Sequence, residues 1–189
     1  TIETNLLGDH QADNAATSIA TIETLIKMGI SIKPESIING FNPINLKGRF
    51  QVIESNRIKF VLDGAHNPDS IERLIFSFRK YFNPKKVILV FGCIDGHDYK
   101  KMLTNLSMLK PILVVSKSRH PKSIPPSDIS KTLEFDDCQL DSLQPTVSNA
   151  IDKALTLATN EDIILVTGSF SIVGEALEKL EGIEPEIYY

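Results

Sequence analysis

The 189-residue chain lacks the features that mark several common classes of protein. It has only two cysteines, Cys93 and Cys138, whose spacing matches neither a metal-binding nor a redox motif. The formal net charge of −4 lacks the basic excess that nucleic-acid binding requires. No apolar run is long enough to cross a bilayer, and the chain does not open like a secretory signal. We therefore expect a cytoplasmic globular protein with no nucleic-acid and no membrane partner.

Several active-site motifs are also missing. The sequence contains no Gly-x-x-x-x-Gly-Lys-Ser/Thr loop and no Gly-x-Gly-x-x-Gly fingerprint, and Ser169 lacks the flanking glycines of a nucleophile elbow. The four histidines fall in separate segments without helical i, i+4 spacing, so we predict no metal-ligating residue here. The chain begins at Thr1 rather than at a methionine, which suggests a piece of a longer protein.

What is present is an alternation of short apolar runs with amphipathic helical patterns. Apolar runs without polar alternation are typical of strands that are buried on both faces of a parallel sheet. The fold class predicted is α/β, a Rossmann-like, mostly parallel sheet with helices on both faces, preceded by a helical end-piece. We place the domains at 1–42 and 43–189, because 41–47 lacks periodicity and carries Pro43. The predicted strands are 49–54, 58–62, 86–91, 112–115 and 163–166, and the predicted helices are 12–28, 34–40, 68–82, 99–109, 127–133, 145–158 and 170–180. Residues 134–141 are predicted to be an acidic connection.

The most informative stretch follows the strand predicted at 58–62. Asp63, Gly64 and His66 are compressed into one tight turn, and Asn67-Pro68 can start a helix. A carboxylate at the end of a buried parallel strand lies where open α/β sheets bind ligands. We expect Gly64 to let the backbone bend sharply and approach a ligand. The turn is therefore predicted to be half of a nucleotide-handling site.

Three further residues are candidates with plain structural alternatives. Arg49 has the side chain best suited to phosphate, although a lone arginine is more often a surface residue. Asn14 could contact a base or a phosphate, or could simply be a polar residue in a first helical turn. Ser169 follows the last predicted strand and could equally cap the final helix.

Taken in order, these segments resemble the folylpolyglutamate synthase/dihydrofolate synthase family within the Mur ligase superfamily. The most specific segment is Asp-Gly-Ala-His-Asn-Pro, and the resemblance covers nearly the whole chain. It rests on Leu7-Gly8-Asp9-His10-Gln11, Asn14-Ala15-Ala16, Gly48-Arg49-Phe50-Gln51, Asp63-Gly64-Ala65-His66-Asn67-Pro68 and Thr167-Gly168-Ser169. The resemblance implies the end of the central ATPase domain (1–42) and a complete Rossmann-like C-terminal domain (43–189).

The resemblance also implies an activity and its site residues. It implies an ATP-dependent ligase that adds L-glutamate to dihydropteroate or folates through an acyl phosphate, with ATP and magnesium as cofactors. By motif, Asn14 and Asp63 contact ATP, Asp63 at the ribose, and Arg49 meets the phosphates. His66 and Ser169 lie by the glutamate or the reacting carboxylate. The magnesium ligands belong to an N-terminal portion that is not in this chain, so we expect these residues alone to fold as a monomer without catalysing.

The chain departs from the family at two places. Leu46-Lys47 stands where the family usually has an aromatic residue and proline, and His97-Asp98 stands where it usually has Lys-Asp. Two other functions stay open: a peptidoglycan-precursor ligase of the same superfamily, and a non-catalytic Rossmann-like binding module. Gly64 and the His10-Gln11 pair favour the folate enzyme over the peptidoglycan one.

Overall fold

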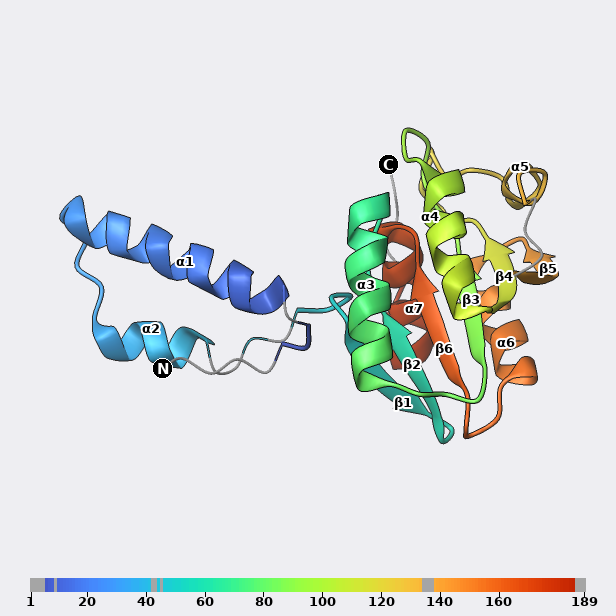
Figure 1. Ribbon diagram of the computed structural model, residues 1–189, viewed down its shortest axis with the longest axis horizontal. Coiled ribbons are helices and arrows are strands. Elements are labelled where there is room, and N and C mark those ends of the chain that lie inside the picture. Colours follow the sequence, from blue (N-terminus) through green and yellow to red (C-terminus); the bar gives the residue numbers. More distant parts are fainter. Residues whose placement is uncertain (1–5, 9, 42–43, 45, 134–137, 186–189) are drawn as a thin grey trace. The chain divides into compact units, whose positions relative to one another are not determined.

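The chain divides into two compact units, Thr1–Lys47 and Gly48–Tyr189, of which the computed structural model describes residues 6–8, 10–41, 44, 46–133 and 138–185 (Figure 1). The first unit contains two helices, α1 (His10–Lys27) and α2 (Pro34–Phe41). The predicted helices at 12–28 and 34–40 correspond to these two, although α1 already begins at His10. Most side chains of α1 are exposed or half-exposed.

The second unit is built on one six-stranded sheet in the order β1-β2-β6-β3-β4-β5. Strand β1 pairs with β2 in an antiparallel hairpin, and all the other pairings are parallel. The predicted fold class is thus confirmed. The strands are β1 (Gln51–Ser55), β2 (Ile58–Leu62), β3 (Val87–Phe91), β4 (Ile112–Ser116), β5 (Gln139–Gln144) and β6 (Ile163–Thr167).

Helices cover both faces of this sheet (Figure 1). On one face the apolar sides of α3 and α4 pack on alternate residues of the central strands, such as Leu89 and Leu165. On the other face α6 and α7 pack on the intervening residues, such as Ile88 and Ile164. Because β3 is apolar throughout and β6 is apolar up to Thr167, both strands are buried on both sides. The helices are α3 (Pro68–Tyr81), α4 (Tyr99–Leu106) with a 3₁₀ turn (Ser107–Leu109), α5 (Pro126–Ser130), α6 (Val147–Leu157) and α7 (Phe170–Glu181).

The predicted connection over 134–141 is wrong where it overlaps β5, which begins at Gln139. Residues 134–137 lie outside the described part of the chain. Strand β5 is the outer strand beside β4, and its residues Gln-Leu-Asp-Ser-Leu-Gln are mostly exposed. An edge strand of this kind needs no continuous apolar run, so its sequence resembles that of a polar loop.

Candidate functional site

The candidate site lies where β2, β6 and β3 end side by side. Their register pairs Leu62 with Val166 and Phe91 with Thr167, so the three carboxyl ends are level. The segments that follow these ends carry most of the predicted site residues. Because β2, β6 and β3 are parallel neighbours, these segments lie at one edge of the sheet, where open α/β sheets bind ligands.

Asp63 binds two backbone segments together at this edge. Its Oδ2 accepts a hydrogen bond from the Phe50 N–H at 2.8 Å, and its Oδ1 accepts one from the Ala65 N–H at 2.8 Å. The carboxylate is only 9% exposed. Hydrogen bonds from neutral donors to an ionised acceptor are stronger than those between neutral groups. Asp63 therefore fixes the conformation of the turn that contains Arg49.

That turn, Gly48-Arg49-Phe50, has an unusual backbone. Phe50 has a φ of 46° although it is not a glycine, and its ring is buried. Gly48 has a φ of 70°, and a Cβ there would lie 2.8 Å from Cγ1 of Val173. The Gly48 carbonyl accepts the Gly64 N–H at 2.8 Å, which links this turn to the turn at Asp63-Gly64-Ala65. We call these two linked turns, with the side chains packed on them, the corner. A strained turn that the surrounding structure holds in place is typical of functional sites.

Arg49 is exposed, whereas its neighbours Gly48 and Phe50 are buried. Its Cζ lies 4.4 Å from the centroid of the Phe170 ring, a cation–π geometry. Within the described part of the chain, its guanidinium makes no hydrogen bond and no ion pair, so its donors can receive an anion such as phosphate. Asp63 and Arg49, the two residues on which the predicted site most depends, therefore belong to the same corner.

Gly64 has a different role from the predicted one. It lacks a left-handed φ, so no sharp bend requires a glycine here. What requires it is the ring of Phe170, because a Cβ on Gly64 would lie 2.3 Å from its Cε1. The residue that approaches the Gly64 backbone closely is thus Phe170 of the same chain. Sequence reasoning missed Phe170, and the only signal for it was an aromatic residue directly after the predicted cap of the last helix.

His66 is half-buried beside the same ring and faces a second histidine. Its ring centroid lies 5.9 Å from that of Phe170 and 5.2 Å from that of His97, which it meets edge-on. Its Nδ1 lies 2.9 Å from the Gly64 carbonyl, an oxygen that can only accept, so Nδ1 carries the hydrogen. In the tautomer with its hydrogen on Nδ1, Nε2 is the ring atom that can accept a proton. Burial, followed by the charge of His66, lowers the pKa of His97.

Ser169 is buried as the N-cap of α7. Its Oγ accepts the Ile172 N–H at 3.3 Å and lies 3.4 Å from the Gly92 carbonyl, to which it can donate. Beside it, Gly168 has a φ of 113°, and a Cβ there would lie 2.5 Å from the Gly92 oxygen. The capping role that the sequence left open is therefore present, and contact with a reacting carboxylate stays a prediction.

Asn14 lies on α1 in the first unit, where it is exposed and its Nδ2 donates to Oε1 of Gln11 at 3.2 Å. Its predicted contact with ATP stays a prediction. Within the part of the chain that the structure describes, no three His, Cys, Asp or Glu residues are grouped so that they could hold a metal ion.

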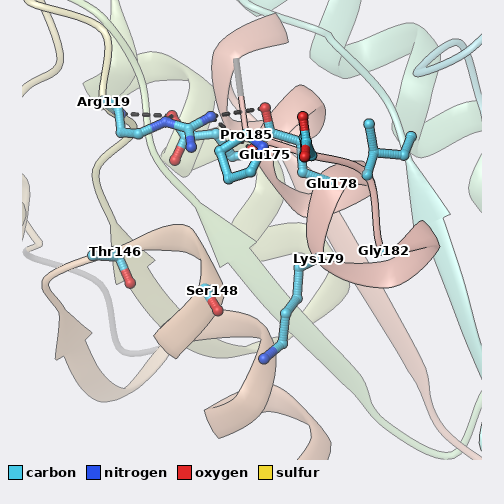
Figure 2. A pocket seen from close by; sticks show the side chains of 10 residues that line it. Arg119, Thr146, Ser148, Glu175, Glu178, Lys179, Gly182 and Pro185 are labelled. Carbon is cyan, nitrogen blue, oxygen red and sulfur yellow. Dashed lines mark hydrogen bonds and ion pairs between the residues drawn. The ribbon is translucent and has the colours of Figure 1, made fainter. Parts of the chain in front are cut away.

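Two other polar residues at strand ends serve the fold. Cys93 follows β3 and is fully buried; burial above all, and then the charge of Asp95, raises its pKa to about 12, which removes it as a nucleophile. Arg119 follows β4 and is held against α7 (Figure 2). Its backbone N–H donates to Glu175 at 2.6 Å, and its guanidinium pairs with Glu178 at 2.6 Å. Arg119, Glu175 and Glu178 line a pocket of about 600 Å³ between α6 and α7.

The comparisons with known proteins agree with this architecture. Residues 48–170, more than half of the chain, match the family described as "Mur ligase, glutamate ligase domain". The chain belongs to this family. The matched range begins at Gly48 and includes every corner residue described above, from Arg49 to Phe170.

Relatives of this Mur ligase domain include enzymes of two kinds. One is the UDP-N-acetylmuramoyl-L-alanyl-D-glutamate–2,6-diaminopimelate ligase of Aquifex aeolicus (strain VF5), 28% identical over 87% of this chain. Another is the dihydrofolate synthase/folylpolyglutamate synthase of Bacillus subtilis (strain 168), 25% identical over 95% of this chain. The chain spans 34% and 41% of the length of these relatives.

Solved structures of folate enzymes have the same fold. Escherichia coli FolC in complex with ADP matches with a TM-score of 0.79 and 24% identity, over 96% of this chain and 41% of that one. The bifunctional folylpolyglutamate synthase/dihydrofolate synthase of Yersinia pestis, complexed with AMPPNP and a manganese ion, matches with a TM-score of 0.68 and 25% identity, over 80% and 35%. Among the described residues, no helix is long and apolar enough to cross a membrane.

Proposed function

We propose that the chain is the carboxyl-terminal part of an ATP-dependent ligase that adds L-glutamate to dihydropteroate or folates. Family membership supports a ligase, and the Yersinia pestis relative carries AMPPNP and manganese. The strongest support for the proposal is the arrangement of Asp63, Arg49 and His66 at the carboxyl ends of the strands. There, the turn fixed by Asp63 presents the Arg49 guanidinium over the Phe170 ring, which His66 also contacts. We expect the whole enzyme to act as a monomer in the cytoplasm.

In the proposed reaction, a substrate carboxylate takes the γ-phosphoryl group of ATP, and ADP leaves. The amine of glutamate then attacks the acyl carbon, and the tetrahedral intermediate expels inorganic phosphate as the amide forms. Arg49 contributes a fixed positive charge where phosphate oxygens develop charge. Asp63, whose two carboxylate oxygens accept the Phe50 and Ala65 N–H groups, also contacts the ribose in this proposal.

His66 is suited to the amine. Because its Nδ1 donates to the Gly64 carbonyl, its Nε2 can take a proton from the glutamate ammonium group, which frees the amine that attacks. We infer that Ser169 acts by holding the start of α7, and that Asn14 contacts ATP from the first unit. We propose that the magnesium ligands lie in a part of the ligase outside this chain, which spans 34% and 41% of the length of two relatives, so this chain alone should have no turnover.

The test is ligase kinetics in the complete protein that contains this chain. Arg49→Ala should lower kcat/KM for ATP by about 10- to 150-fold, because charge-assisted hydrogen bonds are worth about 1.5–3 kcal/mol. Arg73→Ala, an exposed arginine on α3, is the matched control and should change it less than about twofold. Unchanged turnover in both Arg49→Ala and Asp63→Asn would favour the non-catalytic binding module instead.

A second candidate, a peptidoglycan-precursor ligase, is supported by the Aquifex relative. Assays with dihydropteroate plus glutamate, and in parallel with a UDP-muramoyl peptide acceptor, separate the two. We expect ADP release only with the pterin substrate. Turnover with the UDP-muramoyl substrate alone would assign the chain to the other branch of the family.

A further inference from the structure

We propose that Phe170 is a positioning residue of this site, a platform that holds the Arg49 guanidinium where the phosphates bind. The inference rests on the proposed function for what Arg49 binds, and on the structure for how Arg49 is held. Phe170 is the first residue of α7 and is 43% exposed, which is high for a phenylalanine at the centre of a strand-end cluster.

The ring is fixed from several sides. Below it, the Gly64 backbone is so close that an added Cβ would lie within 2.3–2.7 Å of three ring atoms. Beside it lies the imidazole of His66. Its own backbone is fixed by Ser169, which caps α7 through the Ile172 N–H. A ring with so little freedom is a defined surface on which a flexible side chain can rest.

Arg49 is the side chain that rests there. Its Cζ lies 4.4 Å from the ring centroid, and within the described residues its guanidinium has no hydrogen bond or ion pair. A cation–π contact leaves the N–H groups in the guanidinium plane available, whereas an ion pair with a carboxylate would occupy them. Since a free arginine loses much rotamer freedom when it binds, a held arginine binds phosphate more tightly.

The same geometry assigns Gly64 a part in this arrangement. An alanine there would push the ring from its place under the guanidinium, with no direct change at Arg49. Asp63 holds the backbone next to Arg49 through its hydrogen bond from the Phe50 N–H. Phe170 holds the other end of the side chain through its contact with the guanidinium. The arginine is thus constrained at both ends.

The first test reads the contact directly by NMR of the 189-residue chain. Protons of the Arg49 side chain should be shifted upfield by the ring current of Phe170. Phe170→Leu keeps the apolar bulk and should abolish the shift, whereas Phe170→Tyr keeps the ring and should retain it. Phe76→Leu, which removes an exposed phenylalanine on α3, is the matched control and should leave it unchanged. Arg49 protons without an upfield shift in the parent chain would overturn the inference.

The second test is a double-mutant cycle in the complete ligase. Phe170→Leu should raise the KM for ATP by about 2- to 30-fold, the range that cation–π energies imply, and Phe170→Tyr should restore it. Arg49→Ala should then cost several-fold less in the Phe170→Leu background than in the parent. If the effects of Arg49→Ala and Phe170→Leu on kinetics are additive and the variants melt at the parent's temperature, Phe170 does not position Arg49. If the complete protein does not consume ATP, the proposed function fails, and the NMR arm still decides whether Phe170 holds Arg49.

Discussion

The Asp63 carboxylate accepts the backbone N–H of Phe50, a residue thirteen positions earlier that has a left-handed φ of 46°. A left-handed conformation costs a non-glycine residue of order 1–3 kcal/mol, so the turn needs partners that keep it there. Asp63 supplies one through Oδ2, and its Oδ1 holds the following turn at Ala65. A residue expected to touch a ligand thus also builds the corner that presents Arg49.

Asp63→Asn should therefore lower stability as well as activity. An asparagine has one acceptor oxygen where the carboxylate has two, so one of the two backbone N–H groups loses its buried partner. We expect a loss of about 1–3 kcal/mol in the free energy of unfolding, measured by urea denaturation of the 189-residue chain.

Asp128→Asn is the matched control for this charge change. Asp128 is half-exposed on α5 and pairs with the exposed Lys131 at 2.9 Å. Exposed pairs of this kind contribute about 0–1 kcal/mol, so this variant should stay near the parent. Equal losses of unfolding free energy in Asp63→Asn and Asp128→Asn would show that the Asp63 hydrogen bonds stabilise the fold no more than an exposed ion pair does.

The parallel sheet could be predicted from sequence because its central strands contain continuous apolar runs, such as Val87–Phe91 and the first four residues of Ile163–Thr167. Strand β5 could not, because an edge strand with exposed side chains has the composition of a loop. Arg49, Asp63 and His66 were predicted as site residues, but Phe170 and the contacts among these residues were not. Which ring occupies the space over Gly64, or which N–H meets Asp63, depends on segments about 13 to 106 residues apart, and no local pattern encodes that.

Gly64→Ala should disturb the site through Phe170. The new Cβ overlaps the ring, so the ring must move or the core must expand, at about 1–3 kcal/mol. In a Phe170→Ala background the same change should cost less than half as much, because the overlapping ring is gone. Gly174→Ala on α7, where nothing lies within 4 Å, should instead stabilise by about 0.5–1 kcal/mol. Thermal melts of the parent, the three single variants and the double variant check this, and equal costs of Gly64→Ala in both backgrounds would contradict it.

Cys93 should be unreactive in the folded chain. Its side chain is fully buried, and its pKa of about 12 leaves almost no thiolate at pH 8. Iodoacetamide at that pH should leave the Cys93 peptide unmodified until urea unfolds the chain, as read by mass spectrometry. Rapid labelling under native conditions would instead show that Cys93 is accessible and reactive in the folded chain.

The His66–His97 pair should make stability depend on pH. Burial and the neighbouring imidazole lower the pKa of His97 below its ordinary value of 6.5, so the unfolded chain binds its proton more readily than the folded one. This contribution to stability is present above about pH 7 and is lost as the pH falls through 6.5 toward the folded-state pKa. His97→Gln cannot titrate, so its unfolding free energy should fall less steeply between about pH 7 and pH 5 than that of the parent. Above pH 7 the difference between the two chains should be constant, which separates lost packing from titration. Urea denaturation across this range checks the slope, and identical slopes in both chains would exclude His97 as the titrating group.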